Sequence, residues 1–359
     1  MSQVHSNNIQ PSKFSIEQAL AYGQTLRWHK EQGIEEYPNP ACYLAMDVTE
    51  IVKVMERVTR TKNPLFTFQV SARTGQAFPK PTQLGRQFCS LFKLEISQIQ
   101  KEFAHCQFHP LFDLFVRHME GMGPIAVLLA SPNTTDILNR LVENIRREAT
   151  AQAFQQRRDR IKANIRHNLR SLNKYVHDLM RRWARLLVIR LDTGYRKGVP
   201  LQGPRPDATA MIQQARQHRE EFLRCLRRRY PALLGYAWKF EHGITKGPHY
   251  HWLLFFDASQ VRADITLGDE LGQLWKGPIT GWIGTYFNCN REHYHRRGIG
   301  TIHYSDAQSI MALKDYVLPY LVKPEYYLRP KGRARTYDRG QLPKQAPKKR
   351  GRPRLLKWP

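Results

Sequence analysis

Two histidines separated by one residue stand at the start of an apolar run in this 359-residue sequence, GPHYHWLLFF. The run predicts a strand, and because side chains alternate along a strand, His249 and His251 project from one face. The preceding stretch LLGYAWKFE also alternates. Pairing of the two strands across the turn HGITKGP places Glu241 opposite His249, with Cβ atoms about 4.5–5.5 Å apart.

Two imidazoles and one carboxylate on one sheet face predict a metal site. The set leaves open positions for water and substrate oxygens, which suits Mn²⁺ or Mg²⁺ acting on a phosphate. Structural zinc would require a closed tetrahedral set. The alternative interpretation is a buried strand that carries a chance His-x-His.

A second group of chemically capable side chains follows in DYVLPYLVK. Tyr316, Tyr320 and Lys323 are spaced i, i+4 and i+7, so a continuous helix would place them on one face. A tyrosine stripe is usually core, but two phenols with an ammonium make a poor core. Pro319 lies between the tyrosines and would remove a helical hydrogen bond and kink the axis.

The elements that must position these residues alternate between strand and helix patterns. Strands are predicted at 184–192, 233–241, 249–257 and 300–306, and helices at 206–230 and about 260–275. Asp306 or Ser305 is placed to cap a further helix through AQSIMALKDYVLPYLVK. The order β-α-β-β-α-β predicts an α+β fold, with an antiparallel sheet and helices packed on one face.

The remaining chain divides by composition into four regions. Residues 1–150 form a mainly helical N-terminal region of unknown role, 151–183 a basic helix or linker, 184–330 the catalytic domain, and 331–359 a basic disordered tail. Within the tail, Arg350 to Pro353 reads Arg-Gly-Arg-Pro and resembles the core of an AT-hook, which fits a narrow A·T minor groove. An unspecific basic tail is the alternative that we prefer.

The charge balance is strongly basic. The chain has 57 Lys and Arg against 30 Asp and Glu, a formal net charge of +27, which predicts attraction to polyanions. Residues 157–190 alone carry 11 Lys and Arg against 2 Asp, a density that indicates either contact with a nucleic-acid backbone or, equally, a solvated charged face. We therefore expect nucleic acid, and not a membrane, as the partner.

Other sequence signals exclude several classes of protein. The five cysteines lack zinc-finger spacing, and their odd number argues against a disulfide framework. The N-terminus is polar and unlike a signal peptide, and the longest apolar stretch, GPIAVLLASP, is too short to span a bilayer. These features predict a cytoplasmic protein.

The combined motifs resemble the HUH endonuclease superfamily of rolling-circle replication initiators. The stretch WKFEHGITKGPHYHWLLFF resembles its metal motif, and YVLPYLVK is similar to the paired-tyrosine motif of its phage replication proteins. The continuation YLVKPEYYLRPKGRARTYDRG resembles the gene II-like, YagK/YfjJ-type replication proteins of inoviruses and prophages. The resemblance covers about residues 184–340 and implies an RRM-like antiparallel sheet.

The resemblance implies a metal-dependent single-strand DNA endonuclease and ligase-type strand transferase in a bacterial host cell. His249, His251 and Glu241 would hold Mn²⁺ or Mg²⁺, and Tyr320 would attack the scissile phosphate with help from Lys323. A 5′-phosphotyrosine link and a 3′-OH primer result, and Tyr316 would be a second nucleophile. Since no Gly-x-x-x-x-Gly-Lys-Ser/Thr loop occurs, a host helicase and polymerase are expected partners on single-stranded origin DNA.

Two other functions remain open at this stage. A transposase or relaxase would use the same tyrosine chemistry on a different DNA substrate. A non-catalytic prophage DNA-binding protein would keep the sheet and the basic charge without the reaction.

Overall fold

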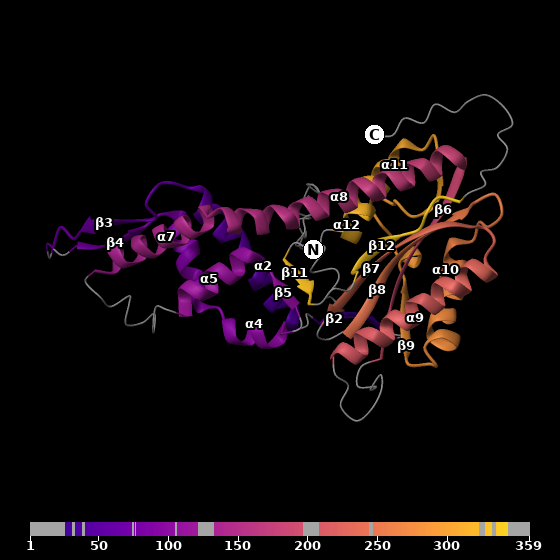
Figure 1. Cartoon of the computed structure of the whole chain (residues 1–359), viewed down its shortest axis with the longest axis horizontal. Helices are drawn as coiled ribbons and strands as arrows, with labels where there is room; N and C mark the ends of the chain where they lie inside the picture. The colour runs from indigo at the N-terminus through magenta and orange to yellow at the C-terminus, as the bar shows by residue number, and fades with distance from the viewer. Residues whose placement is uncertain are drawn as a thin grey trace, which may run out of the picture. The chain divides into compact units, whose positions relative to one another are not determined.

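The computed structural model describes eleven segments of the chain (Figure 1). These are residues 26–30, 33–37, 40–73, 75, 77–104, 106–120, 133–196, 208–243, 247–322, 327–331 and 335–343. The chain separates into two compact units, which we name the sheet unit and the helical unit. The sheet unit comprises Met1–Gly23, Asn168–Lys323 and Ala334–Pro359, and the helical unit comprises Gln24–His167 and Pro324–Arg333.

The sheet unit is built on one antiparallel sheet. Its strands are β6 (Arg185–Tyr195), β7 (Leu233–Gly243), β8 (Gly247–Asp257), β9 (Gly284–Asn288), β10 (Gly300–His303) and β12 (Tyr337–Arg339). The order is β10-β6-β8-β7-β12, and β9 pairs with β6 on the same edge as β10. The predicted α+β class with an antiparallel sheet is confirmed.

Helices cover both faces of this sheet, so the predicted one-sided packing is wrong. The helical segments of the unit are the second half of α8 (Gln152–Arg182), α9 (Ala208–Arg229), α10 (Asp264–Leu274), η2 (Trp275–Ile279), η3 (Cys289–Arg291), α11 (Ala307–Ala312), η4 (Leu313–Val317) and α12 (Leu318–Val322). In Figure 1, α8, α11 and α12 lie on one side of the strands, and α9 and α10 on the other.

The physical reason is the composition of the two central strands. Strand β8 is buried without interruption from Pro248 to Phe256, and a strand that is apolar on both faces requires cover on both. Trp252 and Leu254 pack in one apolar cluster with α9 and α10, whereas Leu253 and Phe255 pack in a second with α8, α11 and α12. The alternation of side chains along β8 could not indicate cover on both faces, because both of these sets of residues are apolar.

Two strands of the sheet unit lie where the sequence predicts none. Strand β9 lies between the helix predicted at about 260–275 and the strand predicted at 300–306, and β12 falls inside the predicted disordered tail. Strand β12 pairs with the outer edge of β7, and Gly340 continues the pairing by donating its N–H to the Tyr236 carbonyl at 2.8 Å. Residues 335–343 of the predicted disordered tail are therefore ordered, while the AT-hook-like residues 350–353 lie outside the described residues.

The helical unit is mainly α-helical. Its helices are α2 (Pro40–Arg60), α3 (Gln83–Ser90), η1 (Leu91–Lys93), α4 (Ile96–Glu102), α5 (Pro110–Glu120), α7 (Thr134–Thr150) and the first half of α8. Three two-stranded antiparallel pairs accompany them: β1 (Leu26–Lys30) with β2 (Gly33–Tyr37), β3 (Phe66–Val70) with β4 (Ala77–Pro81), and β5 (Cys106–Phe108) with β11 (Leu328–Pro330).

The boundaries of the units differ from those expected. The division falls inside α8, which is one continuous helix across residues 152–182 of the predicted linker. Residues 324–333, predicted to end the catalytic domain and begin the tail, belong to the helical unit through the pairing of β11 with β5. Within the described part of the chain, no helix combines the length and apolarity needed to cross a membrane.

His109 links the stability of the helical unit to pH. The imidazole is buried at the start of α5, and its Nδ1 accepts a hydrogen bond from the Leu111 N–H at 3.1 Å. Burial lowers the pKa of His109 from 6.5 to about 4, more than Glu56 raises it. Between these two values the unfolded chain binds a proton that the folded chain does not, so the folded state loses stability as pH falls.

We predict that the free energy of unfolding falls by up to about 3 kcal/mol between pH 7 and pH 4 through this group alone. The His109→Asn variant keeps an acceptor for Leu111 but cannot be protonated, so its stability should depend less on pH. Urea unfolding of both proteins across this pH range measures the difference. Equal pH dependence in the two proteins would contradict the assignment.

Candidate functional site

The β7–β8 hairpin brings three of the predicted residues together. Glu241 lies directly opposite His249, and His251 lies opposite Lys239 in the same register. The strands extend closer to the turn than predicted, and only residues 244–246 between them are outside the described part. On the opposite face, Trp238, Phe240, Tyr250 and Trp252 pack into the apolar cluster. This aromatic packing fixes which face of the hairpin carries the polar side chains.

The three side chains converge on one point. Glu241 Oε2 lies 3.4 Å from His249 Nε2 and 3.5 Å from His251 Nε2. One potential ligand atom from each residue lies within 4.8 Å of the others. Both imidazoles are buried, with side-chain exposures of 9% for His249 and 3% for His251. The site is therefore a compact, largely desolvated set of two nitrogens and a carboxylate oxygen.

Asp192 on β6 orients the second imidazole. It pairs with His251 across the neighbouring strand, and His251 Nδ1 donates a hydrogen bond to Asp192 Oδ1 at 2.7 Å. In the neutral imidazole, a proton on Nδ1 leaves the lone pair on Nε2, on the side of Glu241. A carboxylate behind an imidazole is the arrangement that fixes metal-binding histidines in proteins. The sequence shows Asp192 only as the acid that ends an apolar run.

The electrostatics of the group favour a positive charge between its carboxylates. Burial lowers the pKa of His251, but Asp192 and then Glu241 outweigh it and raise that pKa to about 9. Burial also acts to raise the pKa of Glu241, yet His251 and His249 hold it well below its usual value. In the metal-free protein a proton on His251 supplies the positive charge. A divalent cation would replace that proton.

The donor set and its surroundings fit a divalent metal ion. His251 Nε2 is buried and has no hydrogen bond of good geometry, although Glu241 lies within reach. Glu241, His249 and His251 would be the protein ligands, and three ligands leave positions for water or substrate oxygens. Lys239 is also fully buried on this strand pair, where it lies opposite His251.

Tyr320 on α12 lies against the histidines. Its ring is 5.4 Å from the ring of His251, centre to centre, in an edge-to-face arrangement, and it is 5% exposed. On its face the guanidinium carbon of Arg190 lies 4.1 Å from the ring centre. Burial raises the pKa of Tyr320 well above 10, and Arg190 is the strongest opposing influence. The phenol thus stands between an imidazole and a permanent cation.

Arg190 is a second residue that the sequence analysis missed. It lies on β6 where the strand passes from β10 to β9, and its side chain also lies 3.9 Å from Asp192. On this edge of β6, neither β10 nor β9 pairs with Arg190, and the side chain of Asn290 makes the backbone hydrogen bonds there. Its Oδ1 accepts from the Arg190 N–H at 2.9 Å, and its Nδ2 donates to the Val188 carbonyl at 3.0 Å. The signal in the sequence that could have identified Arg190 is its position inside the apolar run LLVIRL.

Tyr316 does not share the environment of Tyr320, so the predicted single helical face is wrong. The helix begins as predicted at Asp306, whose side chain accepts from the Ser309 N–H, but it includes the π-helical turn η4. A π turn and a proline, Pro319, disturb the i, i+4 alignment. Tyr316 is half-buried, and its Oη accepts from Arg296 at 2.5 Å. Lys323 lies outside the described residues.

One comparison with known proteins bears on this unit. Residues 147–286 match the YagK/YfjJ C-terminal domain family. The YagK/YfjJ match is consistent with a prophage-type protein. It includes Arg190, Asp192, Glu241, His249 and His251 and ends before the two tyrosines. No curated protein and no solved structure matches the chain significantly.

We predict that Mn²⁺ stabilises the protein through the Glu–His–His group. At a free concentration 100 times the dissociation constant, binding to the folded state alone adds about 2.7 kcal/mol. The Glu241→Gln variant should lose this gain, because an amide cannot replace the carboxylate charge. Thermal unfolding with and without Mn²⁺ measures it, with Glu220→Gln on exposed α9 as the matched control. Equal stabilisation of both variants would sink the assignment.

Asp192→Asn tests the orienting carboxylate. The pKa of His251 should fall from about 9 toward 6.5, because an amide does not stabilise the imidazolium. Loss of such a partner typically lowers metal affinity 10- to 100-fold. NMR titration of the metal-free protein gives the pKa, and calorimetry with Mn²⁺ gives the affinity. An unchanged His251 pKa would mean that Asp192 does not hold the ring.

Proposed function

We propose that the protein is a metal-dependent HUH-type endonuclease that nicks one DNA strand and transfers it, to start rolling-circle replication. The observation that carries the proposal is the contact of the Tyr320 ring with His251 of the converged Glu–His–His group. A buried phenol beside three potential metal ligands is a poor apolar core but a suitable nucleophile for a phosphodiester. The prophage-type family match supports the same setting.

The metal ion held by Glu241, His249 and His251, Mn²⁺ or Mg²⁺, would supply Lewis-acid stabilisation of charge on the scissile phosphate. The protein side chains prepare the site for this role. Asp192 keeps the His251 lone pair on Nε2, and burial strengthens electrostatic interactions by excluding water. The Glu–His–His face lies on central strand β8, where the hairpin and β6 restrict movement of the ligands.

In the reaction, Tyr320 Oη attacks the phosphorus and forms a tyrosine–phosphate bond, while the bond from phosphorus to the 3′ oxygen breaks. The phenol loses one proton and the leaving 3′ oxygen gains one, so protons balance. Because the new phosphodiester conserves the bond energy, a strand 3′-OH can reverse the step without ATP. Arg190 opposes the unfavourable effect of burial on the phenolate form of Tyr320.

The products fit initiation of replication. The 5′ end of the cut strand stays on Tyr320, and the free 3′-OH primes a polymerase. Tyr316, held by Arg296, would be the second nucleophile that accepts the strand when a round closes. The scissile bond must be unpaired to reach a buried phenol, so single-stranded or melted origin DNA is the substrate, and a host helicase would unwind the duplex.

Basic side chains would hold the DNA backbone. Helix α8 carries most of the 11 Lys and Arg of residues 157–190, and α9 ends in Arg227, Arg228 and Arg229. Such contacts are independent of sequence and weaken with salt. They support a nucleic-acid partner for the protein.

The direct test is incubation of the protein with single-stranded DNA of its own replicon and Mn²⁺ or Mg²⁺. We expect a covalent protein–DNA adduct on a denaturing gel, abolished by chelation and mapped to Tyr320 by mass spectrometry. Tyr320→Phe should reduce adduct formation at least about 10³-fold, because no other group replaces a covalent nucleophile. Tyr316→Phe, the matched tyrosine variant, should still cut and rejoin the strand but fail in the second transfer that closes a circle.

Two outcomes would contradict the proposal. Metal-independent DNA binding with neither nick nor adduct across the whole replicon would leave a non-catalytic DNA-binding protein. An adduct of normal yield in Tyr320→Phe would place the nucleophile elsewhere. Joining of two different DNA molecules, in place of circle closure, would favour a transposase or relaxase with the same site.

A further inference from the structure

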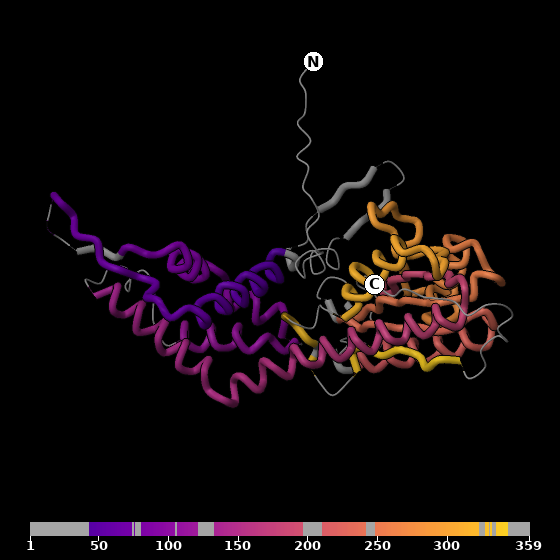
Figure 2. Tube along the Cα trace, turned by 90° about the horizontal axis from the view of Figure 1, so that it is seen from above, coloured from indigo at the N-terminus to yellow at the C-terminus, as the bar shows by residue number. Residues whose placement is uncertain are grey.

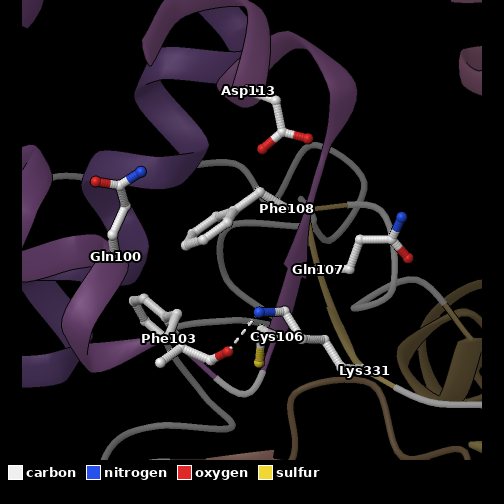
Figure 3. A pocket seen from close by; sticks show the side chains of 8 residues that line it. Gln100, Phe103, Cys106, Gln107, Phe108, Asp113 and Lys331 are labelled. Atoms are coloured by element: carbon white, nitrogen blue, oxygen red, sulfur yellow. Dashed lines mark hydrogen bonds between the residues drawn. The ribbon is translucent and has the colours of Figure 1, made fainter. Parts of the chain in front are cut away.

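The helical unit has a cavity of its own. It lies between α4, α5 and the β5–β11 pair and has a volume of about 400 Å³ (Figure 3). Every residue that lines it belongs to the helical unit. A depression of this size matches the lower range of small-ligand sites and accommodates a single planar group such as a nucleobase.

An immobilised aromatic ring borders the cavity. Phe108 stacks on Phe112 with ring centres 4.1 Å apart and an angle of 13°, and Phe103 meets it edge to face at 6.3 Å. Phe112 is buried and does not line the cavity, so the opposite face of the Phe108 ring borders it. Because neighbouring rings already hold Phe108, stacking of a planar ligand on it loses little side-chain entropy.

Polar side chains surround this ring. Gln100 and Gln107 are exposed and offer amide donors and acceptors, and Asp113 offers a half-buried carboxylate. Lys331 lies at the rim, where its Nζ donates to the Ala104 carbonyl at 2.7 Å (Figure 3). An aromatic floor with hydrogen-bonding groups at its edge is the composition that recognises unpaired bases.

Positive charge accompanies the cavity. Burial raises the pKa of Asp113, and Arg157, Arg117 and Lys331 act against that rise, so three cations lie within electrostatic range of the carboxylate. Arg117 is already paired with Glu148 at 2.6 Å, so Lys331 and Arg157 are the two cations left to act with Asp113. The surroundings therefore attract a polyanion, while the floor itself is apolar and aromatic.

We infer that this cavity binds one unpaired base of single-stranded DNA. The base stacks on the outer face of Phe108, its edge meets the amide of Gln100, and Asp113 accepts from a base N–H. Lys331 and Arg157 contact the flanking phosphates. The choice of DNA rests on the proposed function, but binding requires neither the metal nor Tyr320.

The test uses the full chain and a 12-nucleotide single-stranded DNA with one 2-aminopurine base, in the presence of a chelator. Stacking quenches 2-aminopurine fluorescence, and anisotropy gives the affinity. Phe108→Leu should weaken binding about tenfold and reduce the quench, because it keeps apolar volume but removes the ring. Phe108→Tyr should restore both. Lys331→Gln should instead reduce the dependence of affinity on salt concentration.

Phe92→Leu is the matched control. Phe92 is also half-buried in the helical unit and stacks on a core ring, Phe115, but it does not line the cavity. Unchanged binding by Phe108→Leu, or an equal loss in Phe92→Leu, would overturn the inference. Because the measurement excludes metal and cutting, a protein that fails to nick DNA can still pass it, and the two proposals fail separately.

Discussion

Burial of strand β8 on both faces is the constraint on which the rest of the sheet unit depends. Its even-numbered residues, such as Tyr250 and Trp252, pack with α9 and α10, and its odd-numbered residues face α8, α11 and α12. The two histidines occupy odd positions, so they are enclosed between the sheet and the tyrosine-bearing helix. A polar group in such a place needs partners, because an unpaired buried polar group costs about 1–3 kcal/mol.

Each charged side chain at the site therefore lies beside a group of opposite charge. Two carboxylates, Glu241 and Asp192, flank His251, and Arg190 lies beside Asp192 and over Tyr320. Buried ion pairs of this kind contribute little net stability, because desolvation offsets most of the attraction. Their value here is geometric: one imidazole orientation and one ring orientation satisfy all the partners. The same arrangement places two carboxylates around one imidazole, and a divalent ion bound there would balance their negative charge.

The two tyrosines illustrate how a small backbone irregularity separates equivalent residues. Four residues apart in a regular α-helix, they would face the same partners. The π turn before Pro319 changes this, so that Tyr320 is buried against His251 while Tyr316 is half-buried and held by Arg296. Each phenol consequently has an arginine of its own. The asymmetry gives the two tyrosines different environments within one short segment.

The sequence by itself determined the features that depend on local pattern. Period-two alternation and a short turn sufficed to predict that Glu241, His249 and His251 would meet, because a hairpin joins neighbours along the chain. Only the tertiary structure decided that Asp192 and Arg190 complete the site, that helices cover both sheet faces, and that residues 337–339 add an edge strand. These features depend on which distant strands pair and on which side chains become buried between the sheet and its helices. The local spacing of residues does not encode either one.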